Sequence, residues 1–169
     1  MVRLFSFLAL LAGVACLASA APRVPKEIGA AYRGLSEAIL AKDYRAIEQF
    51  YNGAVWIAPD GTRLRPRQMR TLYEANFKAI TRISRQEIRI KNVREPERGQ
   101  LEMEVEYVYE FSMFEPSSRR VQQFELIELS SDLWRRQGNS WRLSTSTVSQ
   151  QRTLRNGVEV FRTPAKEDQ

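Results

Sequence analysis

Tyrosine and tryptophan residues at eight positions are the side chains best suited to line a binding pocket. Each carries a large ring with a polar tip, which can pack against an apolar ligand and orient it through a hydrogen bond. The same residues also fill ordinary cores with their polar tips on the rim or on a backbone group, and this alternative stays open. These residues are Tyr32, Tyr51, Trp56, Tyr73, Tyr107, Tyr109, Trp134 and Trp141.

Asp60 is the acidic residue expected closest to the mouth of such a pocket. A desolvated aspartate can act as a general base. In the sequence Pro59-Asp60-Gly61-Thr62, however, an aspartate usually hydrogen-bonds its own backbone in a turn. We therefore assign no catalytic residue. The predicted ligand pocket consists of Tyr32, Tyr51, Trp56, Asp60, Tyr73, Tyr107, Tyr109 and Trp134.

The chain contains no histidine, and Cys16 is its only cysteine. This excludes Ser-His and Cys-His nucleophiles, histidine acid catalysis and ordinary zinc sites. Catalysis near neutral pH would require an Asp, Glu, Lys or Tyr whose pKa is shifted by burial. We expect no metal and no cofactor.

Two clusters of charged residues admit a functional and a plain interpretation. A row of glutamates could hold a cation, but a cation site needs carboxylates that converge, and this row runs along one face of a strand. The preceding strand carries basic residues. The plain interpretation is therefore that the glutamates form cross-strand ion pairs on a solvated or dimer-forming face. Four arginines could bind an anionic ligand, an acidic polysaccharide or a membrane surface, or could form a solvated surface. No nucleic-acid-binding motif is present. The glutamates are Glu102, Glu104, Glu106 and Glu110, their partners Arg85, Arg89 and Lys91, and the arginines Arg63, Arg65, Arg67 and Arg70.

Residues 1–20 have the pattern of a cleaved signal peptide, with Arg3, an apolar run and Ala18-Ser19-Ala20. A short membrane anchor and lipidation of Cys16 are the alternatives, but the run is too short for a stable membrane span. Cleavage of this segment removes Arg3. Of the 26 basic residues 25 then remain, against 20 acidic ones, so the formal net charge falls from +6 to +5. We expect a periplasmic or secreted protein.

The mature chain contains helical patterns followed by strands. Residues 21–26 form an extended leader, and apolar positions then recur at helical spacing over 27–41, 44–51 and 66–80. A short apolar strand at 54–58 and the turn at 59–62 separate the last two helices. Strands follow over 83–93, 101–113, 120–134 and 141–149, with an edge strand at 158–161, and 163–169 form a disordered tail.

The order of these elements predicts one α+β domain over residues 27–162, with helices on one face of an antiparallel sheet. Strands of this length twist strongly, so the sheet should form a cone-shaped, curved wall around the N-terminal helices. Odd-numbered side chains from Leu101 to Met113 should face those helices, leaving a cavity between sheet and helices.

The order and spacing of four segments resemble the nuclear transport factor 2-like superfamily, in its SnoaL-like and ketosteroid-isomerase-like branch. These segments are 42–44, 49–51, 59–62 and 133–143. The resemblance covers roughly residues 27–149. It implies a cone-shaped α+β barrel with a pocket, often dimeric through its sheet, but no single chemistry.

The residues that carry the known reactions of that superfamily are absent. The resemblance places the general base of the isomerases at Ala58 and their oxyanion-hole tyrosine at Leu35, and the histidine of the dehydratases has no counterpart. The sequence therefore favours a non-catalytic protein that binds a small apolar or aromatic ligand or a partner, as a homodimer. A cofactor-free isomerase or hydro-lyase is the alternative, and a structural module that dimerises through its sheet is a third. A buried carboxylate opposite a tyrosine hydroxyl would favour the enzyme, and an apolar outer sheet face with a filled cavity would favour the module.

Overall fold

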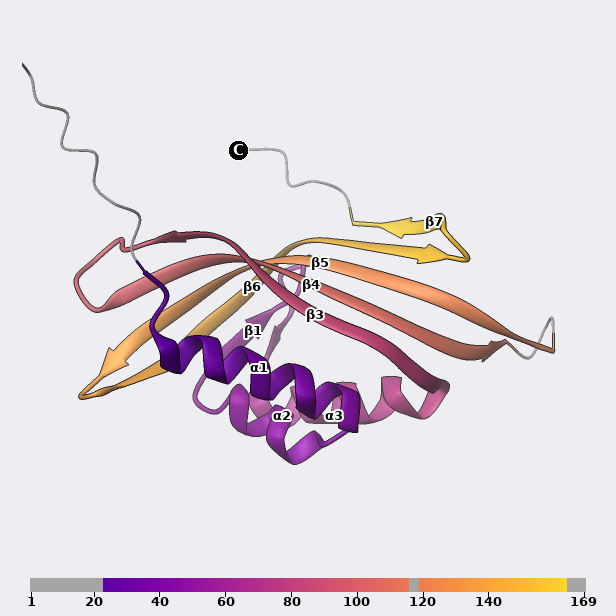
Figure 1. The fold of residues 1–169 in the computed structure, drawn as a ribbon, viewed down its shortest axis with the longest axis horizontal. Coiled ribbons are helices and arrows are strands. Elements are labelled where there is room, and N and C mark those ends of the chain that lie inside the picture. Colours follow the sequence, from indigo (N-terminus) through magenta and orange to yellow (C-terminus); the bar gives the residue numbers. More distant parts are fainter. Residues whose placement is uncertain (1–22, 116–118, 164–169) are drawn as a thin grey trace, which may run out of the picture.

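The computed structural model describes residues 23–115 and 119–163. The predicted signal peptide with Cys16, part of the turn after the second long strand and residues 164–169 of the predicted tail lie outside these ranges. The described chain is an α+β domain in which three helices cover one side of a single sheet (Figure 1).

The three helices are α1 (Lys26–Ala41), α2 (Tyr44–Phe50) and α3 (Pro66–Ala79). Lys42 ends α1 in the left-handed conformation, with φ of 55°. The Asp43 carboxylate begins α2 by accepting the backbone N–H groups of Arg45 and Ala46, both at 3.0 Å. Lys42 also donates through Nζ to the carbonyl of Ile80 at 2.9 Å, which links the α1–α2 connection to the end of α3.

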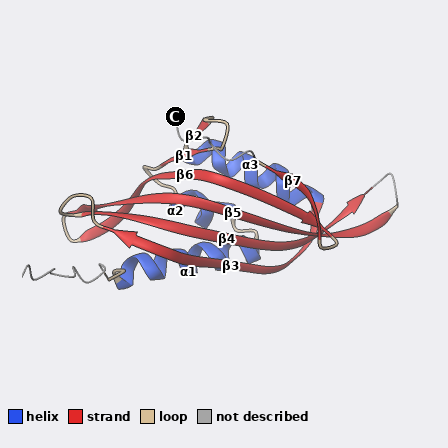
Figure 2. Cartoon of the chain, turned by 90° about the horizontal axis from the view of Figure 1, so that it is seen from above, coloured by secondary structure: helices blue, strands red, loops and turns tan. Residues whose placement is uncertain are grey.

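The sheet contains seven strands in the order β2-β1-β6-β5-β4-β3, and β7 pairs with β6. Its long strands run beside one another from one end of the molecule to the other (Figure 2). The strands are β1 (Val55–Ile57), β2 (Arg63–Leu64), β3 (Ile80–Arg94), β4 (Gln100–Glu115), β5 (Arg120–Gln137), β6 (Ser140–Arg155) and β7 (Val158–Arg162).

The sheet is curved, and its helix-facing side holds the core. Leu101, Met103, Val105 and Tyr107 on β4 are all buried there. The predicted direction of the odd-numbered side chains of this strand is therefore confirmed. The sheet is open, because β3 and β2 form its two edges and do not pair with each other. The resemblance implied a barrel, whereas the structure has a curved sheet that does not close.

Three features of the sheet differ from the sequence prediction. β1 runs parallel to β6, with Trp56 opposite Ser146, so the sheet is not purely antiparallel. The two-residue strand β2 was not predicted. β6 extends to Arg155 because its polar second half still pairs with β5 and β7, although its residues no longer alternate in polarity.

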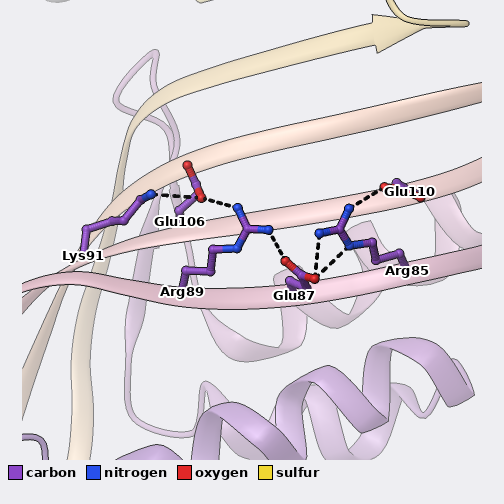
Figure 3. Close-up of polar contacts among 6 residues, drawn as sticks. All are labelled: Arg85, Glu87, Arg89, Lys91, Glu106 and Glu110. Atoms are coloured by element: carbon purple, nitrogen blue, oxygen red, sulfur yellow. Dashed lines mark hydrogen bonds and ion pairs between the residues drawn. The ribbon is translucent and has the colours of Figure 1, made fainter.

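The outer face of β3 and β4 carries the predicted cross-strand ion pairs (Figure 3). Arg85 pairs with Glu110 at 2.8 Å, and Glu106 accepts both Arg89 at 3.1 Å and Lys91 at 3.3 Å. Glu87 joins the two arginines into one network. Since the basic side chains are exposed, water and salt screen these pairs, and each adds little to stability. The other two glutamates of the row differ from the prediction, because Glu102 pairs with Arg94 at 2.7 Å and Glu104 forms no ion pair within the described ranges.

Gln86 on β3 has a side-chain amide whose nitrogen and oxygen are both fully buried, and neither atom has a hydrogen-bond partner within the described ranges. It lies across from Tyr109, on the helix-facing side. We expect Gln86→Met to raise the free energy of unfolding by about 1 kcal/mol, because it keeps the shape and removes an unpaired amide. Urea denaturation measures the change, with Gln137→Met at an exposed position as the control. A clear loss of stability in Gln86→Met would contradict this interpretation.

Candidate functional site

A cavity of about 370 Å³ lies between α3 and the helix-facing side of β3, β4 and β5. Its walls are mainly apolar, and α3 covers it because Met69 and Phe77 anchor that helix in the core. A pocket of this size and polarity is typical of small-molecule sites. The apolar wall includes Leu72, Phe77, Ile83, Phe111, Met113 and Leu126.

Glu128 is the acidic side chain in this wall. It lies on the helix-facing side of β5, opposite Tyr107 of β4 and Gln151 of β6, and is 9% exposed. In the described part of the chain, no group forms a hydrogen bond or ion pair with its carboxyl group. Burial, and secondarily the charge of Asp132, raise the pKa of Glu128 to about 8. At neutral pH this carboxyl group is therefore mostly protonated.

Three tyrosine hydroxyls lie near Glu128. Tyr73 of α3 and Tyr109 of β4 line the cavity, and Tyr51 at the end of α2 is buried beside them. Burial, followed by the charge of Glu128, raises the pKa of Tyr73 to about 12, although the hydroxyls of Tyr109 and Tyr51 lie close enough to oppose this rise. Burial also raises the pKa of the other two. All three hydroxyls therefore remain hydrogen-bond donors at neutral pH.

Asp132 is a second buried acid on the same face of β5, but it has many partners. Its Oδ2 accepts the hydroxyls of Tyr32 and Tyr107, both at 2.7 Å. Its Oδ1 accepts Ser146 at 2.6 Å and Ser130 at 3.0 Å. Burial raises the pKa of Asp132, while these four hydroxyls oppose the rise by stabilising the ionised form.

The structure distributes the eight predicted pocket residues over three places. Trp56, Tyr73 and Tyr109 line the cavity, with Tyr51 beside them. Ligand binding by this group stays a prediction.

The remaining four lie elsewhere. Tyr32, Tyr107 and Trp134 surround Asp132 in the core, where Trp134 donates its indole N–H to Tyr32 at 3.0 Å. Asp60 lies on the exposed turn and accepts the backbone N–H of Thr62 at 2.8 Å, which lowers its pKa. It does not line the cavity, and the turn geometry explains it.

The two buried acids, Glu128 and Asp132, were missed by the sequence analysis. The sequence of β5 does contain a signal for these two acids. Side chains of a strand alternate between its two faces, and both acids lie at even-numbered positions, as do Leu126 and Trp134, which face the helices. An acid at such a position must be withdrawn from water.

The chemistry available in the cavity is acid–base chemistry by one carboxyl group and hydrogen bonding by tyrosine hydroxyls. No lysine or arginine is present among the described residues that line it. Within residues 23–115 and 119–163, no three Cys, His, Asp or Glu side chains are grouped so as to hold a metal ion. No helix in the same ranges has the length and apolar character needed to cross a membrane.

Several solved structures share this fold at low sequence identity. LinA superposes with a TM-score of 0.60 at 10% identity, over 83% of this chain and 88% of that protein. A ketosteroid isomerase-like protein from Erwinia carotovora atroseptica gives 0.54 at 17% identity, over 73% and 92%. Aln2 from a Streptomyces species gives 0.57 at 14% identity, over 75% and 91%. No protein-family model and no curated protein matches the sequence.

The raised pKa of Glu128 predicts a specific dependence of stability on pH. The folded chain holds a proton up to about pH 8, whereas the unfolded chain releases it near 4.5, so the free energy of unfolding must fall as pH rises between these values. The loss attributable to this group is at most about 5 kcal/mol. We expect Glu128→Gln to remove it and to be more stable than the wild type at pH 9.

Urea denaturation from pH 4 to pH 9 measures this effect. Glu125→Gln, on the same strand and partly exposed, is the matched control and should keep the wild-type pH dependence. Parallel stability curves for the wild type and Glu128→Gln would show that Glu128 ionises normally in the folded chain.

Proposed function

We propose that this chain, which has the fold of the nuclear transport factor 2-like superfamily, binds a small uncharged molecule in the cavity and transfers a proton within it. The observation that carries the proposal is Glu128, a buried carboxyl group that has no partner among the described residues and lies in a mainly apolar wall. The reaction class is that of a cofactor-free isomerase or hydro-lyase.

Glu128 suits proton transfer because both of its protonation states are accessible near neutral pH. A pKa of about 8 makes its carboxylate a stronger base than an exposed glutamate, and the protonated form can return the proton. Desolvation is the main cause of this pKa, so the basicity comes from the cavity itself.

The tyrosine hydroxyls supply the second requirement of such a reaction. When Glu128 removes a proton from a carbon next to a carbonyl group, negative charge develops on the carbonyl oxygen. A hydroxyl of Tyr73 or Tyr109 can donate a hydrogen bond to that oxygen. An isomerase then returns the proton from Glu128 to a different carbon, whereas a hydro-lyase expels a hydroxyl group that takes the proton and leaves as water.

The charge of the cavity restricts the substrate class. An anionic substrate would bring its charge beside Glu128 and Asp132 with no basic side chain among the described wall residues to balance it. A substrate that fits is therefore uncharged, largely apolar and small enough for about 370 Å³.

The structure supports the three hypotheses from the sequence, namely a non-catalytic binder, an enzyme and an interaction module, to different degrees. A buried carboxyl group near tyrosine hydroxyls favours the enzyme over a non-catalytic binder, because a binder of apolar ligands gains nothing from an unpaired acid. The mainly apolar wall keeps small-ligand binding without catalysis as the second candidate. The interaction module is disfavoured, because the outer face of β3 and β4 is charged and the cavity is not filled.

Export and dimerisation through the sheet belong to the proposal as well. The support for export is the signal-peptide pattern of residues 1–20, and the support for a dimer is the superfamily resemblance alone. Sedimentation at micromolar concentration that shows only monomer would remove the dimer.

Export predicts a defined mature N-terminus. In a bacterial host with a periplasm, we expect signal peptidase to remove residues 1–20, so that intact-mass spectrometry of the periplasmic fraction finds a chain beginning at Ala21. Ala18→Arg with Ala20→Arg should block cleavage and serves as the control. A full-length chain that remains in the cytoplasm would contradict export.

The proton-transfer proposal can be tested with 5-nitrobenzisoxazole, an uncharged aromatic probe. A base removes its ring C–H proton, the N–O bond breaks, and the coloured phenolate forms. We expect a rate that rises with pH, is half-maximal near pH 8 and reaches a plateau above it, and that falls at least about 100-fold in Glu128→Gln. Tyr73→Phe should lower the plateau because it removes a donor to the developing phenolate.

Glu125→Gln is the matched control and should retain the wild-type rate. If Glu128→Gln retains it too, Glu128 does not act as a base, and binding without catalysis becomes the better proposal.

A further inference from the structure

The hydrogen bonds around Asp132 have a fixed direction. The indole N–H of Trp134 can only donate, and it donates to the Tyr32 hydroxyl at 3.0 Å. Tyr32 in turn gives its own proton to Oδ2 of Asp132 at 2.7 Å. Tyr107 donates to the same oxygen at 2.7 Å. Oδ2 is therefore an acceptor of two hydroxyl protons.

The second oxygen of Asp132 is satisfied in the same way. Oδ1 accepts the hydroxyls of Ser146 at 2.6 Å and Ser130 at 3.0 Å. A proton on the carboxyl group would turn one of these four hydroxyls from a donor into an acceptor, and the proton of that hydroxyl would then need another buried partner. Four O–H donors on a fully buried carboxyl group, three of them at 2.6 or 2.7 Å, are the environment of an ionised carboxylate.

This carboxylate and Glu128 share the helix-facing side of β5, with Ser130 between them. The other ionisable groups that face Glu128 are Tyr73 from α3, Tyr109 and Tyr107 from β4 and Tyr51 from the end of α2.

These four phenols are neutral across the physiological range, because burial raises the pKa of each. In the described chain no lysine or arginine lines the cavity. A negative charge at Asp132 therefore acts on Glu128 without a cation to offset it, in surroundings where charges interact more strongly than in water.

We propose that Asp132 is ionised in the folded protein and is a positioning residue that keeps the carboxyl group of Glu128 protonated at neutral pH. This inference rests on the proposed function only in treating Glu128 as the base of the reaction. The buried charge sets the pH at which the cavity acid becomes a base, and the hydroxyls of Tyr32, Tyr107, Ser130 and Ser146 hold that charge in place. The charge of Asp132 is also the second cause of the raised pKa of Glu128.

Carbon-13 NMR of protein labelled at the Asp and Glu side-chain carboxyl carbons tests this without any substrate. The resonance lost in Glu128→Gln identifies Glu128, and the resonance lost in Asp132→Asn identifies Asp132. In the wild type at pH 7 we expect Asp132 ionised and Glu128 protonated. In Asp132→Asn the titration midpoint of Glu128 should fall by up to about one pH unit, because two groups four residues apart on a strand are roughly 13 Å apart and interact across a low effective dielectric constant.

Ser146→Ala tests the hydroxyl support and does not depend on the folding of Asp132→Asn. It removes one donor to Asp132, so the midpoint of Asp132 should rise. Ser131→Ala is the matched control, because that serine donates to Glu102 at 2.7 Å and belongs to the opposite parity of β5. It should leave both midpoints unchanged.

Two results would overturn the proposal: an Asp132 that is protonated at pH 7 in the wild type, or a Glu128 midpoint that does not move in Asp132→Asn. Both are independent of catalysis. A lowered Glu128 midpoint combined with no Glu128-dependent turnover of 5-nitrobenzisoxazole would keep this inference and reject the proposed reaction.

Discussion

The withdrawal of two carboxyl groups from water on one strand is the constraint on which the site depends. Asp132 and Glu128 occupy inward positions of β5, between β4 and β6, so both are buried by the same sheet and helices. Their surroundings nevertheless differ. Asp132 receives four hydroxyl donors, whereas Glu128 receives none and borders the cavity. One environment stabilises a charge and the other opposes it, and this difference separates the two acids chemically.

Most of the fold could be predicted because the long strands and helices follow simple periods. β4 alternates over its whole length, which determined both its existence and the side that faces the helices. The local cap at Asp43 and Pro66 at the first position of α3 marked helix starts in the same direct way. The parallel pairing of β1 with β6 could not be predicted, since it joins residues about ninety positions apart and depends on how the sheet curves.

The candidate site was predicted only in part, for a physical reason. The aromatic residues were identified by type, but type alone does not separate a cavity wall from a sealed core: Tyr73 and Tyr109 line the cavity, whereas Tyr32 and Trp134 support Asp132. An acid in a strand is normally assigned to the solvated face, so Glu128 and Asp132 escaped notice. Their burial has two causes. The alternation of β5 places both acids on the inward face, which the sequence shows, and the helices cover that face, which the sequence does not show.

Folding alone explains Asp132 but does not explain Glu128. Replacing Asp132 would leave four buried hydroxyls without their acceptor, so the core requires that residue. No comparable set of partners requires an acid at position 128, where an apolar side chain of similar size would complete the wall beside Leu126 without the cost of desolvating a carboxyl group. Gln86 is also buried without a partner, but an unpaired neutral amide costs less than an unpaired ionisable group. The proposed substrate, which would exchange a proton with Glu128, would give this acid the partner that the described residues do not supply.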